Sequence, residues 1–332
     1  MANAVAVDSW EGSSVRLGEV VGALAHLRHH SVHRSATRTA VMTLVVVATT
    51  DAGAADANEA IHALGAHHPA RVISIRADPD QAATLDGRID LYRIDGGDTT
   101  QGEGHFVFFE ELTLSVGGQA ALHLDSLVDV FTLADLPVVV WYADALPDPG
   151  DSLLAEADTV VIDSREALDA LALRRLLELA RRRTVVDLSW VRLEPVRSLL
   201  AGLFDPPALR PFVAAVTRAT VKGKYGPRHL LGGWLTAQLR LAPHQVDLID
   251  ARHVEVTLEA HLDDEVGTFD VGRLDAKHAV WAGATVSTGP SPRQILPLPD
   301  NRLSSSLASA VTRLQADSVW ERALSAAGAL AV

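Results

Sequence analysis

The chain has 332 residues and a formal net charge of −13, because 42 acidic residues outweigh 29 Lys and Arg. This acidic excess disfavours nucleic acid and anionic membrane surfaces as binding partners. Cysteine is absent, which excludes disulfides, thiolate metal sites and a cysteine nucleophile.

The N-terminal segment, residues 1–10, lacks the basic start of an export signal, and no apolar run in the chain is long enough to span a bilayer. We therefore expect a cytoplasmic protein. Four histidines follow at i, i+3, i+4 and i+7, so a helix would place them on one stripe: His26, His29, His30 and His33. Because no carboxylate stands nearby, this spacing favours an exposed histidine-rich face over a metal site.

Apolar, β-branched segments alternate with helical patterns through the first 190 residues. Strands are predicted at residues 43–51, 70–78, 105–116, 136–144, 159–164 and 184–190. Helices are predicted at residues 54–65, 120–133 and 165–182. Continuous apolar strands separated by helices predict an α/β domain, with a mainly parallel or mixed sheet and flanking helices.

Aspartates stand at or near the ends of these predicted strands: Asp51, Asp78, Asp144, Asp163 and Asp187. Open parallel sheets place their binding crevices at this edge, so the carboxylates could bind a cation or sugar hydroxyls. Helix capping and turn formation are the commoner reasons for aspartate at such positions. No glycine-rich phosphate loop, nucleophile elbow or zinc-protease motif accompanies them.

The segment 184–207, "TVVDLSWVRLEPVRSLLAGLFDPP", runs from a strand into an amphipathic helix that ends at two prolines. Periodicity accounts for its apolar face, which comprises Val196, Leu199, Leu200, Leu203 and Phe204. Trp190 and Arg192 lie on the connector, and Trp and Arg are enriched at the centres of protein interfaces. Trp190, Arg192 and Arg197 are therefore candidate partner contacts. The alternative is that Trp190 covers the core and Arg192 pairs with a carboxylate such as Glu194.

Beyond residue 207 the pattern changes to a smaller α+β domain. Helices are predicted at residues 209–219, 230–241 and 304–327, antiparallel strands at 253–262, 267–274 and 279–288, and a Pro-rich loop at 289–299. The predicted domains are residues 1–165 and 166–332, although the boundary could lie as late as residue 206. A basic cluster around "GKYGP" precedes the second helix and is a candidate anion site or a plain surface loop: Lys222, Lys224, Arg228 and His229.

Residues 187–205 resemble the D-L-x-W-x-R-L-x-P-W-R-x-L-L-A-x-L-F-D signature of the glucose-6-phosphate dehydrogenase assembly proteins, the OpcA family. Residues 38–48, 67–75, 133–144, 157–164 and 230–239 are similar to that family in order and character. Val196 replaces the second Trp of the signature, and the missing cysteines separate the chain from relatives linked to redox control.

The resemblance implies a non-catalytic assembly protein or allosteric activator that contacts glucose-6-phosphate dehydrogenase, in a hetero-oligomer, and supports the pentose phosphate pathway. It implies no catalytic residue, no cofactor and no bound metal. The alternative is an enzyme or sensor for a sugar phosphate, which would use the strand-end aspartates and the Lys222–His229 cluster.

Overall fold

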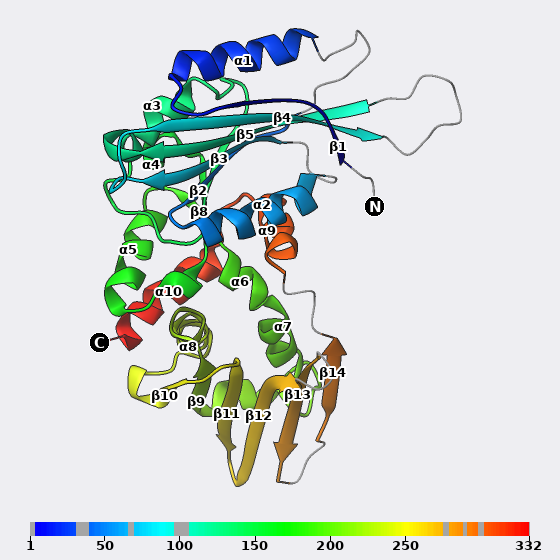
Figure 1. Ribbon diagram of the computed structural model, residues 1–332. Coiled ribbons are helices and arrows are strands. Elements are labelled where there is room, and N and C mark those ends of the chain that lie inside the picture. The colour runs from blue at the N-terminus through cyan, green and yellow to red at the C-terminus, as the bar shows by residue number, and fades with distance from the viewer. Residues whose placement is uncertain are drawn as a thin grey trace. The chain divides into compact units, whose positions relative to one another are not determined.

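A computed structural model describes residues 4–30, 40–65, 70–95, 106–274, 279–287, 291–297 and 302–331 (Figure 1). The chain divides into two compact units. The first unit comprises Met1–Ile162, Arg183–Val186 and Arg302–Gln315, and the second comprises Asp163–Arg182, Asp187–Asn301 and Ala316–Val332. Neither unit is a single stretch of chain, because segments of the two alternate along the sequence.

The first unit is built on an eight-stranded mixed sheet with the order β1-β4-β5-β3-β2-β6-β7-β8. Strands β5, β3, β2, β6 and β7 run parallel, whereas β4 is antiparallel to both β1 and β5. The strands are β1 (Ala4–Gly12), β2 (Thr43–Ala48), β3 (Arg71–Asp78), β4 (Leu85–Asp95), β5 (Phe106–Gly117), β6 (Val138–Tyr142), β7 (Thr159–Ile162) and β8 (Thr184–Asp187). Every residue of β2 is buried, as a central strand covered on both faces requires.

Helices cover this sheet on both faces (Figure 1). Helix α1 (Leu17–His30) packs on β1 and β4, whereas α2 (Asp51–Gly65) packs on β2 and β3 and also contacts α9 (Leu303–Val311). The remaining helices of the unit are short: α3 (Leu124–Asp129), α4 (Leu153–Glu156) and the 3-10 turn η1 (Gly118–Leu122). This arrangement confirms the predicted α/β architecture with flanking helices.

The second unit is built on a six-stranded sheet with the order β10-β9-β11-β12-β13-β14. Only the β9/β10 pair is parallel, and the other neighbours are antiparallel. The strands are β9 (Val216–Gly223), β10 (Val246–Asp250), β11 (Glu255–Leu262), β12 (Glu265–Leu274), β13 (Ala279–Val286) and β14 (Arg293–Pro297). Burial alternates along β11, which is the pattern of a sheet with one covered face.

Helices pack on one another and on the sheet of the second unit. Helix α8 (Tyr225–Leu239) packs against α10 (Ser318–Leu330), β9 and β10, and α10 also contacts α5 (Ala170–Ala180). Helix α7 (Glu194–Gly202) packs on β12 and β13. The other elements are α6 (Leu188–Arg192) and the 3-10 turns η2 (Ser164–Glu166), η3 (Arg210–Ala215) and η4 (Pro243–Gln245). The predicted apolar face from Val196 to Phe204 is confirmed, since all five of its residues are buried.

Several predicted elements were wrong in type or extent. Residues 209–219, predicted as a helix, form η3 and then the start of β9, in which β-branched residues lie among buried neighbours. The predicted loop 289–299 contains the exposed edge strand β14. The predicted helix 304–327 is two helices, α9 and α10, which belong to different units. Strands β1 and β4 were not predicted.

Candidate functional site

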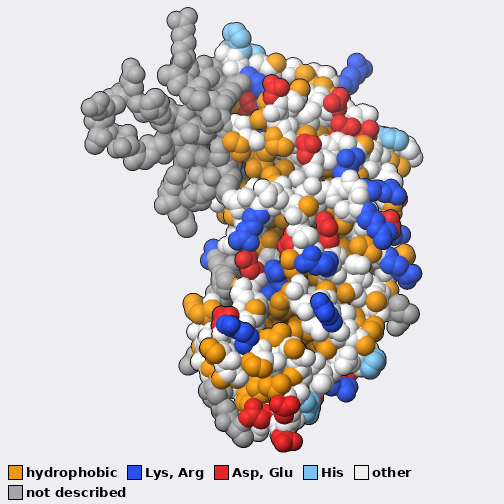
Figure 2. Space-filling model, turned by 180° about the vertical axis from the view of Figure 1, so that it is seen from behind, with side chains coloured by type: hydrophobic (Ala, Val, Ile, Leu, Met, Phe, Trp, Pro, Cys, Tyr) orange, Lys and Arg blue, Asp and Glu red, His pale blue; other side chains and the backbone are white. Residues whose placement is uncertain are grey.

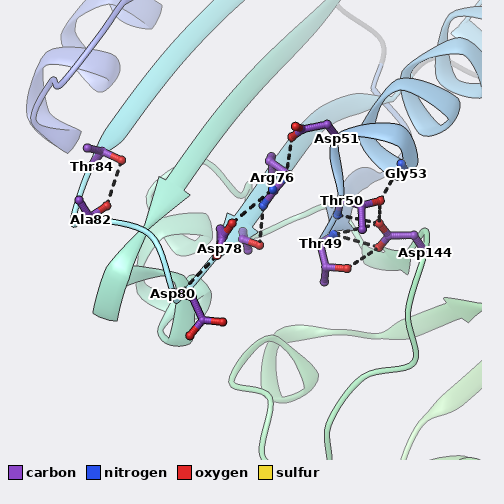
Figure 3. A network of polar contacts seen from close by, with 11 residues as sticks. Thr49, Thr50, Asp51, Gly53, Arg76, Asp78, Asp80, Ala82, Thr84 and Asp144 are labelled. Carbon is purple, nitrogen blue, oxygen red and sulfur yellow. Dashed lines mark hydrogen bonds and ion pairs between the residues drawn. The ribbon is translucent and has the colours of Figure 1, made fainter.

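The parallel sheet has its switch point at the ends of β2 and β6, two neighbouring strands whose connections run in opposite directions along the sheet. Doubly wound sheets place their ligand-binding crevice at such a point. Here the carboxylate of Asp144, which follows β6, lies at this position, beside Thr49 and Thr50 (Figure 3). It accepts hydrogen bonds from the backbone N–H groups of Thr49 at 2.9 Å and Thr50 at 2.8 Å, and from both threonine hydroxyls, at 3.2 and 2.6 Å.

These threonines lead into the N-terminus of α2, whose free N–H groups and dipole favour an anion. Burial alone would raise the pKa of Asp144, but the hydrogen bonds from Thr50 and Thr49 hold it below its ordinary value. Gly53 completes the arrangement, because a Cβ atom there would lie 2.1 Å from Oδ2 of Asp144. The chain's own carboxylate therefore occupies the anion position of this crevice.

The other two strand-end aspartates of the first unit share one arginine. Arg76 Nε donates to Asp51 at 2.9 Å, and Arg76 Nη2 donates to Asp78 at 3.3 Å (Figure 3). Asp78 also accepts the backbone N–H of Asp80 at 3.1 Å, which closes the turn after β3. Asp51 and Asp78 thus form a local ion-pair network beside the crevice.

Asp163 and Asp187, the remaining strand-end aspartates, form a buried cluster in the second unit. Ser189 joins them, since its backbone N–H donates to Asp187 at 2.9 Å and its hydroxyl donates to Asp163 at 2.6 Å. Arg165 pairs with Asp163 at 2.9 Å, and Arg192 also pairs with it. Both aspartates cap turns or helices as well, so capping describes part of their role.

The surroundings shift the pKa values of these two carboxyl groups in opposite directions. Burial raises the pKa of Asp187 to about 6, and the negative charge of Asp163 adds to that rise. Burial would also raise the pKa of Asp163, but the charges of Arg192 and Arg165 hold it below its ordinary value. Asp163 is therefore the ionised member of the pair, and Asp187 is the member that holds a proton in mildly acidic solution.

We expect Asp187 to make the protein less stable as the pH rises from about 4 to 7. A carboxyl whose pKa is raised in the folded state binds its proton more tightly there than in the unfolded chain, so stability falls between the two pKa values. Its contribution is on the order of 3 kcal/mol. Urea unfolding at pH 4.5 and 7.5 should show a smaller change for Asp187→Asn than for the wild type. Asp80→Asn, which alters an exposed carboxylate, should follow the wild type; parallel profiles for all three would contradict the assignment.

Helices α6 and α10 are joined by two reciprocal tryptophan–aspartate contacts. Asp187, the N-cap of α6, accepts from Trp320 Nε1 of α10 at 3.1 Å, and Asp317, the N-cap of α10, accepts from Trp190 Nε1 of α6 at 2.8 Å. The sequence carries a signal for this pairing that was missed. Asp and Trp stand three residues apart in both "DLSW", 187–190, and "DSVW", 317–320.

The predicted interface residues all have contacts within their own unit. Trp190 is only 5% exposed. The guanidinium carbon of Arg197 lies 3.5 Å from the Trp190 ring centroid, and its Nη2 donates to Trp190 O at 3.2 Å. Arg192 forms an ion pair with Asp163, whereas the sequence suggested Glu194 as an example of its carboxylate partner. Whether a partner touches these residues is untested and stays a prediction.

The structure does not gather the four residues of the predicted anion cluster into one site. Lys222 pairs with Glu255 at 2.9 Å, Arg228 lies 3.5 Å from Asp250, and the buried His229 uses Nδ1 on Tyr225 O at 2.7 Å. Burial lowers the pKa of His229. Lys224 alone lines a pocket.

The histidine stripe is described only in part. His26, His29 and His30 lie in α1, whereas His33 lies outside the described residues. Within the described ranges, no group of three His, Asp or Glu side chains could hold a metal ion. Every helix in those ranges is too short or too polar to cross a membrane. On the face drawn in Figure 2, acidic, basic and apolar side chains are interspersed.

Comparison with solved structures finds distant likenesses. Levoglucosan dehydrogenase is 10% identical, with coverage of 88% of this chain and 97% of that one and a TM-score of 0.43. The WlbA dehydrogenase of Thermus thermophilus is 12% identical, with coverage of 88% and 95% and a TM-score of 0.41. Likenesses this distant carry no argument about function.

Two family models match consecutive parts of the sequence. The glucose-6-phosphate dehydrogenase subunit N-terminal domain matches residues 61–184, and the C-terminal domain of the same subunit matches residues 183–324. The OxPP cycle protein OpcA of Synechocystis sp. is 28% identical over 145 residues, which cover 40% of this chain and 30% of that relative. The chain thus belongs to the glucose-6-phosphate dehydrogenase subunit family, OpcA.

Proposed function

We propose that this protein is a non-catalytic partner of glucose-6-phosphate dehydrogenase that promotes the assembly or activity of the enzyme and so supports the oxidative pentose phosphate cycle. The choice of partner rests on the family's description as a dehydrogenase subunit. The observation that carries the non-catalytic role is the position of Asp144 in the switch-point crevice.

Dinucleotide enzymes of doubly wound type bind the pyrophosphate at the first strand-to-helix turn of the parallel sheet, on backbone N–H groups at a helix N-terminus. In this chain the corresponding N–H groups of Thr49 and Thr50 donate to Asp144. A phosphate entering the crevice would meet a carboxylate whose low pKa keeps it ionised at neutral pH. Lost donors and like-charge repulsion both oppose NADP binding there.

The alternative, an enzyme acting on a sugar phosphate through the strand-end aspartates, has less support. All five carboxylates already accept from protein donors: Asp51, Asp78, Asp144, Asp163 and Asp187. Asp144 and Asp163 are poor general bases because their pKa values lie below the ordinary value. Asp187, whose pKa is raised, is only 2% exposed and accepts hydrogen bonds from Ser189 and Trp320. Their partners favour roles in folding.

We expect the isolated chain neither to reduce NADP with glucose 6-phosphate nor to bind NADP through the backbone donors of Thr49 and Thr50. Mixed with purified glucose-6-phosphate dehydrogenase, it should form a heavier complex, seen by light scattering, and raise the activity per enzyme subunit. An equal concentration of an unrelated acidic protein is the control. Turnover by the isolated chain would refute the non-catalytic role, and unchanged mass together with unchanged activity would refute the partner role.

Asp144→Ala provides a sharper test of the crevice. Removal of the carboxylate leaves the donors of Thr49 and Thr50 without their acceptor, so the melting temperature should fall. Added inorganic phosphate should then raise the melting temperature of the variant more than that of the wild type. An equal response in both proteins would show that Asp144 does not occupy an anion position.

A further inference from the structure

A pocket of about 390 Å³ in the second unit is lined by basic side chains. Its polar wall consists of Arg165, Ser189, Arg192, Lys224, Arg252, His253 and Arg273, and among the described residues no Asp or Glu lines it. The volume lies in the range of small-molecule sites. The site is distinct from the Asp144 crevice, which belongs to the first unit.

Separate elements bring these charges together. Arg165 comes from η2, Arg192 from α6, and Arg273 from β12, while Arg252 and His253 stand between β10 and β11. Lys224 is the N-cap of α8, a helix of 15 residues whose dipole adds positive potential at that end. In a chain with a net charge of −13, a convergence of five Lys and Arg around one cavity is unexpected. Mutual repulsion makes it costly unless an anion offsets it.

The protein itself supplies only part of that compensation. Asp163, which is 2% exposed, pairs with Arg165 and Arg192 and so neutralises one of the charges. Lys224 and Arg252 are exposed, and neither has an ion pair with any described residue. Lys224 and Arg252 therefore contribute positive charge to the pocket that no described acidic residue offsets by an ion pair.

We propose that this pocket binds a small molecule that carries a phosphate group. Arginine forks and a lysine ammonium are the groups that recognise phosphate oxygens, the first by paired hydrogen bonds and the second as a point charge. The apolar part of the lining, which includes Val196, Val254 and Val280, provides a surface for the carbon skeleton of the ligand. A sugar phosphate and a phosphorylated nucleotide share this chemistry. The volume of about 390 Å³ is the size of a small-molecule site, which favours such a ligand over an acidic protein segment.

Calorimetric titration of the isolated chain tests the proposal without the dehydrogenase. The probes are inorganic phosphate, glucose 6-phosphate, NADP and unphosphorylated glucose. We expect one equivalent of a phosphorylated probe to bind, with an affinity that falls as salt is added, and no binding of glucose. Glucose 6-phosphate binding without NADP binding would assign the sugar phosphate, and the reverse result would assign the nucleotide. Binding of inorganic phosphate alone, only at high concentration, would overturn the proposal.

Lys224→Gln and Arg252→Gln should each weaken binding of the phosphorylated probe about tenfold. Both side chains are exposed, so the melting temperature should change little. Arg182→Gln removes an exposed charge of the same unit that does not line the pocket, and it should bind as the wild type does. Equal affinities of the wild type and all three variants for the phosphorylated probe would overturn the proposal. So would Lys224→Gln and Arg252→Gln variants that bind the probe normally but no longer bind the dehydrogenase. Failure here leaves the mixing experiment unaffected, because that experiment requires no phosphate site.

Discussion

Trp190→Ala is expected to lower the free energy of unfolding by about 4 kcal/mol, the cost of truncating a large buried aromatic side chain. This substitution removes three interactions of the Trp190 side chain. The indole packs at 5% exposure, its Nε1 donates to the N-cap Asp317, and Arg197 stacks on its face. Urea unfolding of the isolated protein measures the loss directly.

Trp190→Phe separates the hydrogen bond from the packing. It keeps an aromatic ring under Arg197 but removes the donor to Asp317, and should cost about 1–3 kcal/mol. Leu168→Ala, at a side chain that is 75% exposed, should change stability by less than about 0.5 kcal/mol.

The interface hypothesis makes the opposite forecast for Trp190. If Trp190 is a partner contact, Trp190→Ala should leave unfolding unchanged and weaken dehydrogenase binding by about 2 kcal/mol or more. Normal stimulation by the folded fraction of a destabilised variant would instead place the partner surface elsewhere.

Gly233→Ala is expected to destabilise the protein by about 3 kcal/mol, although alanine is the better helix former. Gly233 lies in α8 where α10 crosses it, and a Cβ atom there would lie 2.0 Å from Ala323 O and 2.6 Å from Ala327 N. Both atoms belong to the backbone, so the two helices must separate to admit a methyl group. Thermal and urea unfolding should both report the loss.

Gly328→Ala is the matched control for that substitution. Gly328 lies in the partner helix α10, and a Cβ atom there would meet nothing within 4 Å. Alanine should therefore stabilise the protein by about 0.5–1 kcal/mol. Effects of the same sign at the two glycines would show that helix propensity, rather than close packing of α8 on α10, decides the outcome.

The fold was predictable wherever burial leaves a recognisable apolar pattern in the sequence. The buried β2 was found as a continuous apolar run, the amphipathic α7 by its helical period and the strands β11 to β13 by their alternation. Strands β1 and β4 were not predicted because charged residues interrupt their apolar residues: Asp8 and Glu11 in β1, and the Asp and Arg residues of "RIDLYRID" in β4. The packing of residues 302–315 in the first unit was not predicted either. Helix periodicity shows which face of a helix is buried but not which surface that face packs against.

The sequence identified individual candidate residues of the sites but not which residues lie together in space. Strand-end position drew attention to five aspartates, but they divide among the Asp144 contact, the Arg76 network and the buried Asp163–Asp187 cluster. Their donors come from other segments, such as Thr50 and Ser189, which strand-end position does not reveal. Local charge density pointed to the Lys222–His229 cluster, most of which has partners of its own. The polar side chains of the basic pocket come from five separate parts of the chain, so no single stretch of sequence reveals it.

The alternation of the two units along the chain has a consequence for biosynthesis. Helix α9 completes the first unit and α10 the second, and both lie after residue 301. The ribosome synthesises them only after residues 1–301, so neither unit can reach its final packing before translation has passed α9 and α10. A nonsense codon shortly before residue 302 would therefore damage both units at once, including the Trp190–Asp317 contact. Expression of the two family-matched halves, divided at residues 183–184, should likewise yield aggregation-prone fragments rather than two working domains.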